Sequence, residues 1–376
     1  MGELPWVISV DDHVVEPPHV WERWLPTRWR EHGPRVVDGM TWVYEDLRRP
    51  IPQVMACAGF TRDQLTIDPI PFAEMRPGCY DPVARVADMD LKRTERSLCF
   101  PSFPRFAGQT FLEAHDKDLA LACVVAFNDW MIDEWCGDSG GRLIPLCLVP
   151  LWDPVAAAGE VRRNAARGCR AITFTELPAN LGLPSIHDPG RHWDPLLAAC
   201  DETGTVICMH IGSGSKMQTT SDDAPLGVTT ALTSLNAYMA MADWLLSGVM
   251  ARFPRLKIAF SESQVGWMPF LLERLDRVFT ESRHWSQLDP SVTELPSSYV
   301  PGRVYGCFFD DMVGIEMRHH IGVTQLVFET DYPHQDSTWP DTAKLVAEIA
   351  AMVPPDELEL LMRGNAITML GLPPHL

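Results

Sequence analysis

The sequence predicts a closed parallel (β/α)8 barrel, the TIM barrel, on the strength of its hydrophobic periodicity. Short apolar runs alternate with longer amphipathic segments, as expected when each strand is followed by a crossover helix. Eight repeats of this unit are enough to close a parallel barrel. A doubly wound open sheet is the alternative fold. The predicted strands cover residues 6–11, 95–100, 143–149, 170–175, 205–210, 256–261, 303–309 and 325–330.

The predicted helices lie between these strands, and several of their ends carry the expected signals. Asp153 and Pro154 form an N-cap followed by proline in the first turn. Gly168 and Gly204 end helical runs directly before strands, where glycine commonly closes a helix. The helical patterns lie near residues 82–92, 110–136, 154–167, 192–203, 225–251, 265–282, 312–320 and 340–352, with a final helix at 355–370.

Residues 14–80 interrupt this alternation. They begin with a helix-like stretch at 19–31 and continue into a Pro- and Trp-rich region with short alternating pieces such as MTWVYED. We interpret the segment as an insertion after the first strand that caps the mouth of the barrel. Residues 1–376 are therefore predicted to form one barrel domain with this cap.

Composition and charge narrow the class of protein. Hydrophobic residues make up 46% of the chain, which provides for a large core. The net charge of −19 argues against nucleic acid and anionic membranes as main partners. The N-terminus shows no signal peptide, and no stretch resembles a membrane span. We expect a cytoplasmic protein whose cysteines, which form no C-x-x-C pair, are reduced.

Six potential metal ligands occupy the carboxyl ends of predicted strands. Each follows a short apolar run and precedes loop residues, and in a parallel barrel such positions converge on one mouth. Four carboxylates gathered there would repel one another strongly without cations. The sequence therefore predicts a metal site formed by Asp11, His13, Glu176, His210, Glu262 and Asp331.

The first and last of these motifs resemble a known family. Asp11 and His13 stand two residues apart, so an extended strand directs both to the same face. This D-x-H, the His of MHIGS and the Asp of ETDYPHQDSTWP resemble the amidohydrolase superfamily over roughly residues 6–335. More narrowly, the chain is similar to the amidohydrolase 2 branch, which includes aminocarboxymuconate semialdehyde decarboxylase.

The resemblance implies a (β/α)8 barrel that binds metal through H-x-H on strand one, a His on strand five and an Asp on strand eight. The decarboxylase branch often keeps one metal and a catalytic His at the end of strand six. This chain departs at two positions, because Asp11 replaces the first His and Glu262 occupies the strand-six position. Dinuclear members add a bridging carboxylate from strand four, where this chain has Glu176.

The departures make the ligand set rich in oxygen, which favours harder ions than a His-dominated zinc site does. We therefore hypothesise two divalent ions, with iron or manganese favoured and zinc as the alternative. The first ion would be held by Asp11, His13 and Asp331, the second by His210 and Glu262, and Glu176 would bridge them. Each residue also has a structural interpretation, since a His in an apolar strand is often a core residue and a Glu can cap a helix.

The function predicted from this site is hydrolysis of an amide, ester or thioester by metal-activated water. Asp331 is the predicted proton shuttle, and Glu262 serves as a ligand or a general base. His334, in the loop after Asp331, is predicted to contact substrate or donate a proton. The many tryptophans near the mouth suit a small-molecule substrate with a bulky apolar group, such as an acyl-coenzyme A thioester.

Two alternatives to hydrolysis stay open. The resemblance supports metal-dependent, non-oxidative decarboxylation of an aromatic or muconate-like acid, although Glu176 and the absence of the strand-six His favour a bridged pair of ions. The chain could also be an inactive barrel that serves as a binding protein. About two ions per chain would favour hydrolysis and about one would favour decarboxylation. A homodimer is expected by analogy with other barrels.

Overall fold

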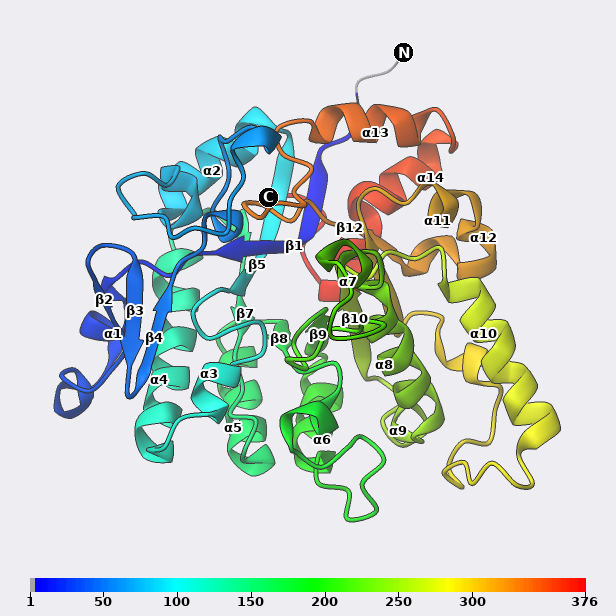
Figure 1. Cartoon of the computed structure of the whole chain (residues 1–376). Coiled ribbons are helices and arrows are strands. Elements are labelled where there is room, and N and C mark those ends of the chain that lie inside the picture. Colours follow the sequence, from blue (N-terminus) through cyan, green and yellow to red (C-terminus); the bar gives the residue numbers. More distant parts are fainter. Residues whose placement is uncertain (1–3) are drawn as a thin grey trace.

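The computed structural model describes residues 4–376 and shows parallel strands surrounded by helices (Figure 1). Eight strand positions follow one another around the barrel, and each lies close to its predicted range. The third position is split into two short strands. The positions are β1 (Val7–Val14), β5 (Thr94–Pro101), β6 with β7 (Leu143–Ile144 and Leu146–Cys147), β8 (Ala171–Thr173), β9 (Val206–His210), β10 (Lys257–Ser261), β11 (Val304–Phe308) and β12 (Leu326–Phe328).

The strands pair in parallel and in order around the barrel. One sheet has the order β1-β5-β6 and the other β12-β11-β10-β9-β8-β7. Pro145 separates β6 from β7 because it has no backbone N–H to give to a ladder. On the other side, the Asp331 N–H donates to the Asp11 carbonyl (2.9 Å) and the His13 N–H donates to the Tyr332 carbonyl (2.7 Å). These bonds close the barrel, so the predicted (β/α)8 fold is confirmed and the open sheet is excluded.

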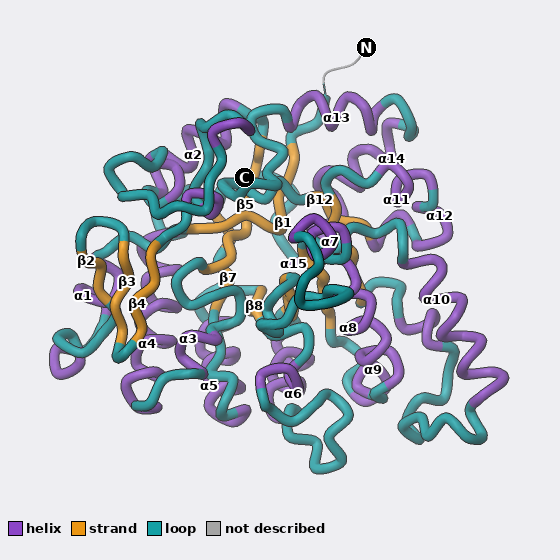
Figure 2. Tube along the Cα trace, viewed as in Figure 1, coloured by secondary structure: helices purple, strands orange, loops and turns teal. Residues whose placement is uncertain are grey.

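The helices form the outer layer that Figure 2 shows in purple around the orange strands. Asp153 accepts from two backbone N–H groups as the predicted N-cap of α5, and Gly168 and Gly204 have the expected positive φ. The longer helices are α2 (Pro82–Leu91), α4 (Lys117–Trp130), α5 (Pro154–Ala165), α6 (Asp194–Thr203), α8 (Ser234–Leu246), α10 (Met268–Arg277) and α13 (Thr342–Ala350). The shorter ones are α1 (His19–Trp24), α3 (Gln109–Leu112), α7 (Leu226–Ala231), α9 (Val249–Arg252), α11 (Met312–Glu316), α12 (Arg318–Ile321), α14 (Pro355–Glu359) and α15 (Asn365–Leu370).

Several predicted helices are shorter or interrupted. The pattern at 225–251 becomes three helices, and the last break is at Gly248, whose φ of 76° is left-handed. The final pattern at 355–370 divides into α14 and α15 around a π turn at Leu360–Gly364. None of the described helices combines the length and hydropathy that a membrane span requires. The ten cysteines are free and buried, in line with the prediction that they are reduced.

The insertion after β1 packs against the side of the barrel and also reaches its mouth. It contains a small antiparallel sheet of β2 (Arg35–Val37), β3 (Thr41–Tyr44) and β4 (Leu47–Pro50), seen beside α4 in Figure 1. Trp21 and Trp42 are buried between this sheet and the barrel, with ring centroids 5.2 Å apart. These two tryptophans are therefore core residues and do not line a substrate pocket.

Glu16 joins the start of the insertion to the loop after β5. Its two carboxylate oxygens accept hydrogen bonds from the backbone N–H groups of Ser102 (2.9 Å) and Phe103 (2.8 Å). Burial raises the pKa of the Glu16 carboxyl from its ordinary 4.5 to about 7, although the two N–H groups oppose the shift. The folded protein therefore holds a proton here that the unfolded chain releases.

Glu16 is predicted to make the metal-free protein less stable as pH rises from 4.5 to 7. The pKa is raised in the folded state, so the favourable contribution is complete below the unfolded pKa and is lost as pH rises through the folded pKa. The wild type and Glu16→Gln can be compared by urea unfolding at pH 5 and pH 8. Between these pH values, the free energy of unfolding should fall by about 2 to 3 kcal/mol more in the wild type than in the variant. Parallel pH profiles for the two proteins would contradict this.

Candidate metal centre

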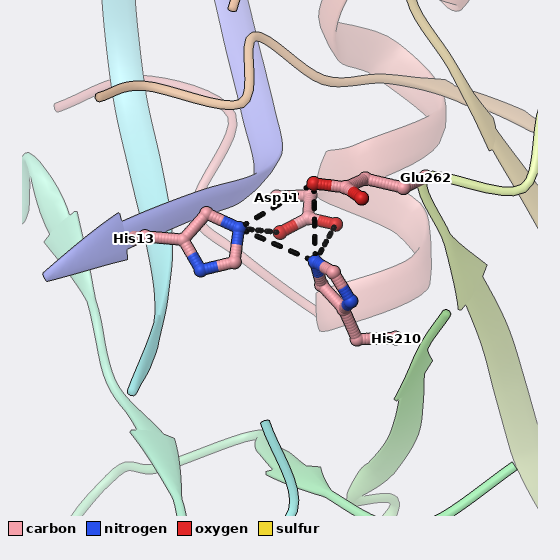
Figure 3. Close-up of side chains that lie close together, drawn as sticks. All are labelled: Asp11, His13, His210 and Glu262. Carbon is pink, nitrogen blue, oxygen red and sulfur yellow. Dashed lines mark hydrogen bonds and ion pairs between the residues drawn. The ribbon is translucent and has the colours of Figure 1, made fainter. Parts of the chain in front are cut away.

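Side chains from three strand ends converge at the mouth of the barrel (Figure 3). Asp11 and His13 extend from β1, His210 ends β9, and Glu262 follows β10. One ligand atom from each of the four lies within 4.8 Å of all the others. The two imidazole Nε2 atoms are 3.3 Å apart, and the His210 Nε2 lies 3.2 Å from Glu262 Oε1. Ligands at about 2.1 Å from one ion lie about 3.0 to 3.4 Å apart, so these separations suit a shared cation.

A second group overlaps the first. His13 and Glu262 belong to both groups, and Asp331 and His334 join them in the second. Asp331 Oδ1 lies 3.1 Å from His13 Nε2 and 3.2 Å from His334 Nδ1. The His334 ring stacks on the His13 ring with centroids 3.5 Å apart. The two groups therefore form one continuous site at the mouth.

The oxygens of this site lack ordinary partners. Both carboxylate oxygens of Asp11 and the Oδ1 of Asp331 are buried, and none has a hydrogen-bond partner among residues 4–376. A buried carboxylate without compensation costs several kcal/mol. A cation held between these oxygens and the imidazoles would remove that cost. The donor set therefore fits a divalent metal ion.

The tautomer of His210 suits metal binding. Its Nδ1 lies 2.6 Å from the Ile211 carbonyl oxygen. Because a carbonyl oxygen can only accept, Nδ1 carries the hydrogen and donates it. With Nδ1 engaged in this way, Nε2 is directed into the site, and the hydrogen bond fixes the orientation of the ring.

Burial and mutual charge shift the titration of the ligands. Burial raises the pKa of Asp11 and of Asp331 well above the ordinary range, and nearby carboxylates add to the rise. Burial lowers the pKa of His13. Burial also opposes ionisation of Glu262, but the imidazoles around it, His210 first, outweigh this and hold its pKa well below the ordinary range. A bound dication would lower the carboxyl pKa values further and displace shared protons.

The backbone is strained at two of the ligands. Glu262 and Asp331 both have a φ of 53°, in the left-handed region that non-glycine residues rarely occupy. Each residue follows a barrel strand, so the turn directs its carboxylate back towards the mouth. Strain of this kind is characteristic of functional sites, where the surrounding structure maintains it.

Asp12 lies on the opposite face of β1 from its two neighbours and has a structural role. Its carboxylate accepts hydrogen bonds from the hydroxyls of Ser9 (2.9 Å), Thr330 (2.5 Å) and Ser97 and from the Tyr332 N–H (3.0 Å). These donors come from β1, from β5 and from the segment after β12. Asp12 therefore ties together the strands that carry the ligands.

A cavity of about 690 Å³ adjoins the metal ligands. One wall is formed by residues 57–62 of the insertion and another by residues 333–341, which follow β12. His334 belongs both to this lining and to the second ligand group. The lining carries two cations, Arg62 and Lys344, and the aromatic ring of Trp339. It also carries four carboxylates, those of Asp310, Asp336, Asp341 and Glu348. This cavity is the candidate substrate site.

Comparison with known proteins identifies the family of this chain. Residues 19–372 match the family model for the amidohydrolase 2 group, which is described as Amidohydrolase. The chain belongs to the amidohydrolase family. Nearly the whole barrel lies within the match, including the ligands from His210 to Asp331, whereas Asp11 and His13 precede it.

Solved structures share the fold of this amidohydrolase. An amidohydrolase from Mycobacterium avium subsp. paratuberculosis has a TM-score of 0.74 and 24% identity, covering 98% of this chain and 100% of that chain. The 5-carboxyvanillate decarboxylase of Novosphingobium aromaticivorans, complexed with manganese, has a TM-score of 0.69 and 17% identity, with 98% and 96% covered. The 2,6-dihydroxybenzoate decarboxylase from Rhizobium has a TM-score of 0.62 and 16% identity, with 98% and 99% covered.

Of the predicted ligands in this amidohydrolase, Glu176 is not brought into either group of ligand atoms. Its Oε1 accepts from the Asn236 side-chain amide (2.6 Å) and from the N–H groups of Gly212 (3.0 Å) and Gly214 (3.4 Å). The carboxylate therefore stabilises the conformation of the loop that follows His210. Its other oxygen, Oε2, is buried and has no hydrogen-bond partner among the described residues, so the bridging role stays a prediction.

Glu329 is a buried carboxylate of the site that the sequence reasoning missed. Burial raises its pKa well above the ordinary range, with the charge of Glu262 adding to the effect, and its Oε2 accepts from the Glu262 N–H (3.2 Å). Glu329 stands two residues before Asp331. The same i, i+2 spacing that singled out Asp11 and His13 would have drawn attention to it.

Replacement of Glu176 by Ala is predicted to leave the number of bound metal ions per chain unchanged and to lower the free energy of unfolding. Three donors would lose a buried acceptor, at a cost of about 2 to 4 kcal/mol. Elemental analysis and urea unfolding measure the two effects, and Glu176→Gln, which keeps an oxygen acceptor, is the matched control. Loss of one of two ions from the Ala variant would instead restore the bridging role.

Proposed function

We propose that this protein is a metal-dependent, non-oxidative decarboxylase of a small aromatic acid. The observation that carries the proposal is that Asp11, His13, His210 and Glu262 surround one position while Glu176 lies outside. An arrangement without the bridging carboxylate suits a single ion better than a bridged pair. A single-ion centre favours decarboxylation over the hydrolysis predicted from the sequence.

The comparisons lend this proposal further support. Several proteins with the same fold are decarboxylases that act on 5-carboxyvanillate or 2,6-dihydroxybenzoate. Three decarboxylase structures of this fold hold manganese. Manganese is an ion that the oxygen-rich ligand set of this chain also suits. We therefore propose manganese as the metal of this protein.

The residues that would hold the ion are Asp11, His13, His210 and Glu262, with Asp331 and His334 beside them. When bound, a divalent ion supplies a Lewis acid for the oxygens of the substrate. Non-oxidative decarboxylation breaks the bond between a ring carbon and its carboxylate, and the electron pair on that carbon accepts a proton. The protein must therefore hold a proton next to the substrate ring.

Asp331 and His334 are placed to supply this proton. The raised pKa of Asp331 favours its protonated form, and its Oδ1 lies 3.2 Å from His334 Nδ1. His334 lines the cavity, and its Nε2 has no hydrogen-bond partner among the described residues. We therefore assign His334 as the group that meets the substrate and Asp331 as the proton reservoir behind it.

The surroundings of the ligands suit a planar acid. The Phe106 ring stacks on the His210 ring with centroids 3.9 Å apart and lies 5.4 Å from the His13 ring. It places an apolar surface beside the imidazoles and limits the access of water. On the cavity side, the lining combines the cations Arg62 and Lys344 with the carboxylates of Asp310, Asp336, Asp341 and Glu348. An aromatic acid would present its ring to Phe106 and its carboxylate to Arg62.

The direct test is decarboxylation of hydroxylated benzoic acids by protein that has been stripped with a chelator and reloaded with Mn²⁺. We expect CO2 and the protonated arene from at least one acid, and none without the metal. Asp331→Asn should lower kcat by about a thousandfold or more, because it removes the proton reservoir. Hydrolysis of amides or thioesters with no release of CO2 from any acid would refute the proposal.

Arg62 is predicted to bind the substrate's anionic group. Arg62→Ala should raise KM for the acid by about 10 to 100-fold with a smaller change in kcat, since the side chain lies in the cavity lining and in neither group of metal ligands. Arg62→Lys, which keeps the charge, should recover much of the loss. A wild-type KM in the Ala variant would show that another residue binds the anion.

Hydrolysis remains the second candidate for one specific reason. The two ligand groups share His13 and Glu262, so a second ion could lie beside the first without a strand-four carboxylate. Two ions per chain, measured by elemental analysis, would favour metal-activated water attacking an amide, ester or thioester. The absence of nucleic-acid partners, a cytoplasmic location and a homodimer stay predictions.

A further inference from the structure

Helix α2 carries two charged side chains that are buried against the barrel. Arg85 is 1% exposed and Asp88 is 6% exposed, and their spacing of three residues places them on one face of the helix. Arginine is rarely so deeply buried unless its donors are satisfied. Neither residue was singled out by the sequence, because one Arg and one Asp in a helix look like ordinary surface residues.

The Arg85 guanidinium grips the backbone of the strand that carries the metal ligands. Its Nη2 donates to the His13 carbonyl oxygen (2.5 Å), and its Nε donates to the Gly78 carbonyl oxygen (2.7 Å). Its Nη1 lies 3.2 Å from the Cys99 sulfur on β5, and the group lies 4.4 Å from the centroid of the Tyr332 ring. The planar guanidinium of Arg85 therefore fixes the position of the His13 backbone from the side opposite the site.

Asp88 binds the segment after β12, which carries Asp331 and His334. The Tyr332 hydroxyl donates to Asp88 Oδ2 (2.6 Å). Arg76 donates to both carboxylate oxygens of Asp88, at 2.7 and 2.6 Å, and its guanidinium lies 5.0 Å from the centroid of the Trp339 ring. Trp339 lines the candidate substrate cavity. Asp88 thus holds both the residue after Asp331 and a wall of the cavity.

Tyr332 contacts both Arg85 and Asp88, and it lies where β1 meets the segment after β12. Its carbonyl oxygen accepts from the His13 N–H (2.7 Å), and its own N–H donates to Asp12 (3.0 Å). Gly78 is closely enclosed at this point. A Cβ added to it would lie 2.3 Å from Asp88 Oδ2 and 2.6 Å from the Tyr332 hydroxyl. The packing therefore leaves little freedom for these groups to move.

We propose that Arg85 and Asp88 are positioning residues for the metal centre. Arg85 fixes the ligand from β1, and Asp88 fixes the segment that carries Asp331 and His334, so together they set how far apart the two sets of ligand atoms lie. Neither side chain touches the metal or the substrate. The inference rests on the proposed function only in requiring that the site binds a divalent ion.

The test compares two buried arginines. Arg85→Lys keeps the positive charge but loses the planar fork that reaches three acceptors. Arg96→Lys is the matched control, because Arg96 is also 1% exposed. In the pairing of β5 with β1, Arg96 lies opposite Ile8, near the start of β1 and away from the ligands. Metal-free samples of both variants and the wild type are titrated with Mn²⁺, and free Mn²⁺ is measured by electron paramagnetic resonance. Thermal unfolding of the metal-free samples measures any general loss of stability.

We expect Arg85→Lys to weaken Mn²⁺ binding by about 10 to 100-fold, as changes behind metal ligands commonly do, and Arg96→Lys by less than about threefold. Asp88→Asn is the second variant, because it keeps the size of the side chain, and it should weaken binding by about three to tenfold. Wild-type affinity in Arg85→Lys and Asp88→Asn, or equal losses in Arg85→Lys and Arg96→Lys, would overturn the proposal.

The proposed function and this inference fail in different ways. If the wild type binds Mn²⁺ but decarboxylates no acid, the proposed function fails while the affinity series still decides the inference. If the wild type binds no Mn²⁺, the metal centre itself fails and the positioning role falls with it.

Discussion

The arrangement of the barrel mouth depends on one constraint, which is that several carboxyl groups are buried close together there. The carboxyl groups of Asp11, Glu262, Glu329 and Asp331 share a small volume that solvent barely reaches. The nearby imidazoles share protons with some of these groups, but the oxygens of Asp11 have no hydrogen-bond partner among residues 4–376. Leaving several such groups ionised costs several kcal/mol each, whereas one divalent cation compensates them together. Binding of such a cation would therefore be coupled to the folding of the mouth.

The rest of the barrel holds these mutually repelling groups in place. The backbone bonds that close the barrel join the residues that supply the ligands, since Asp331 donates to Asp11 and His13 donates to Tyr332. Asp12 lies directly behind this seam and accepts four hydrogen bonds. The contacts that close the barrel therefore also bring the residues of the site together. This explains why polar residues occupy the buried strand β1.

Fold and family alone do not fix the reaction, because one barrel supports many chemistries through its loops. Two local features distinguish the possibilities here. One oxygen of Glu176 accepts hydrogen bonds from Asn236 and Gly212, and Glu176 belongs to neither group of ligand atoms, which is the observation behind the single-ion proposal. The cavity beside His334 carries Arg62 from the insertion, which is the cation proposed to bind the acid group of the substrate. Both features lie in segments that connect the strands.

Periodicity and strand-end position in the sequence were enough to predict the barrel and the convergence of ligands such as Asp11 and His210, because each depends on local pattern and on where parallel strands end. The sequence could not determine which way Glu176 turns, since its partners follow a different strand. It also could not distinguish Arg85 from a surface arginine or mark Glu329 as part of the site. Those roles depend on contacts between residues that are close only in the closed barrel. The physical reason is that the burial of a side chain is set by the assembled mouth of the barrel. Burial in turn sets the strength of the electrostatic interactions of each charged group.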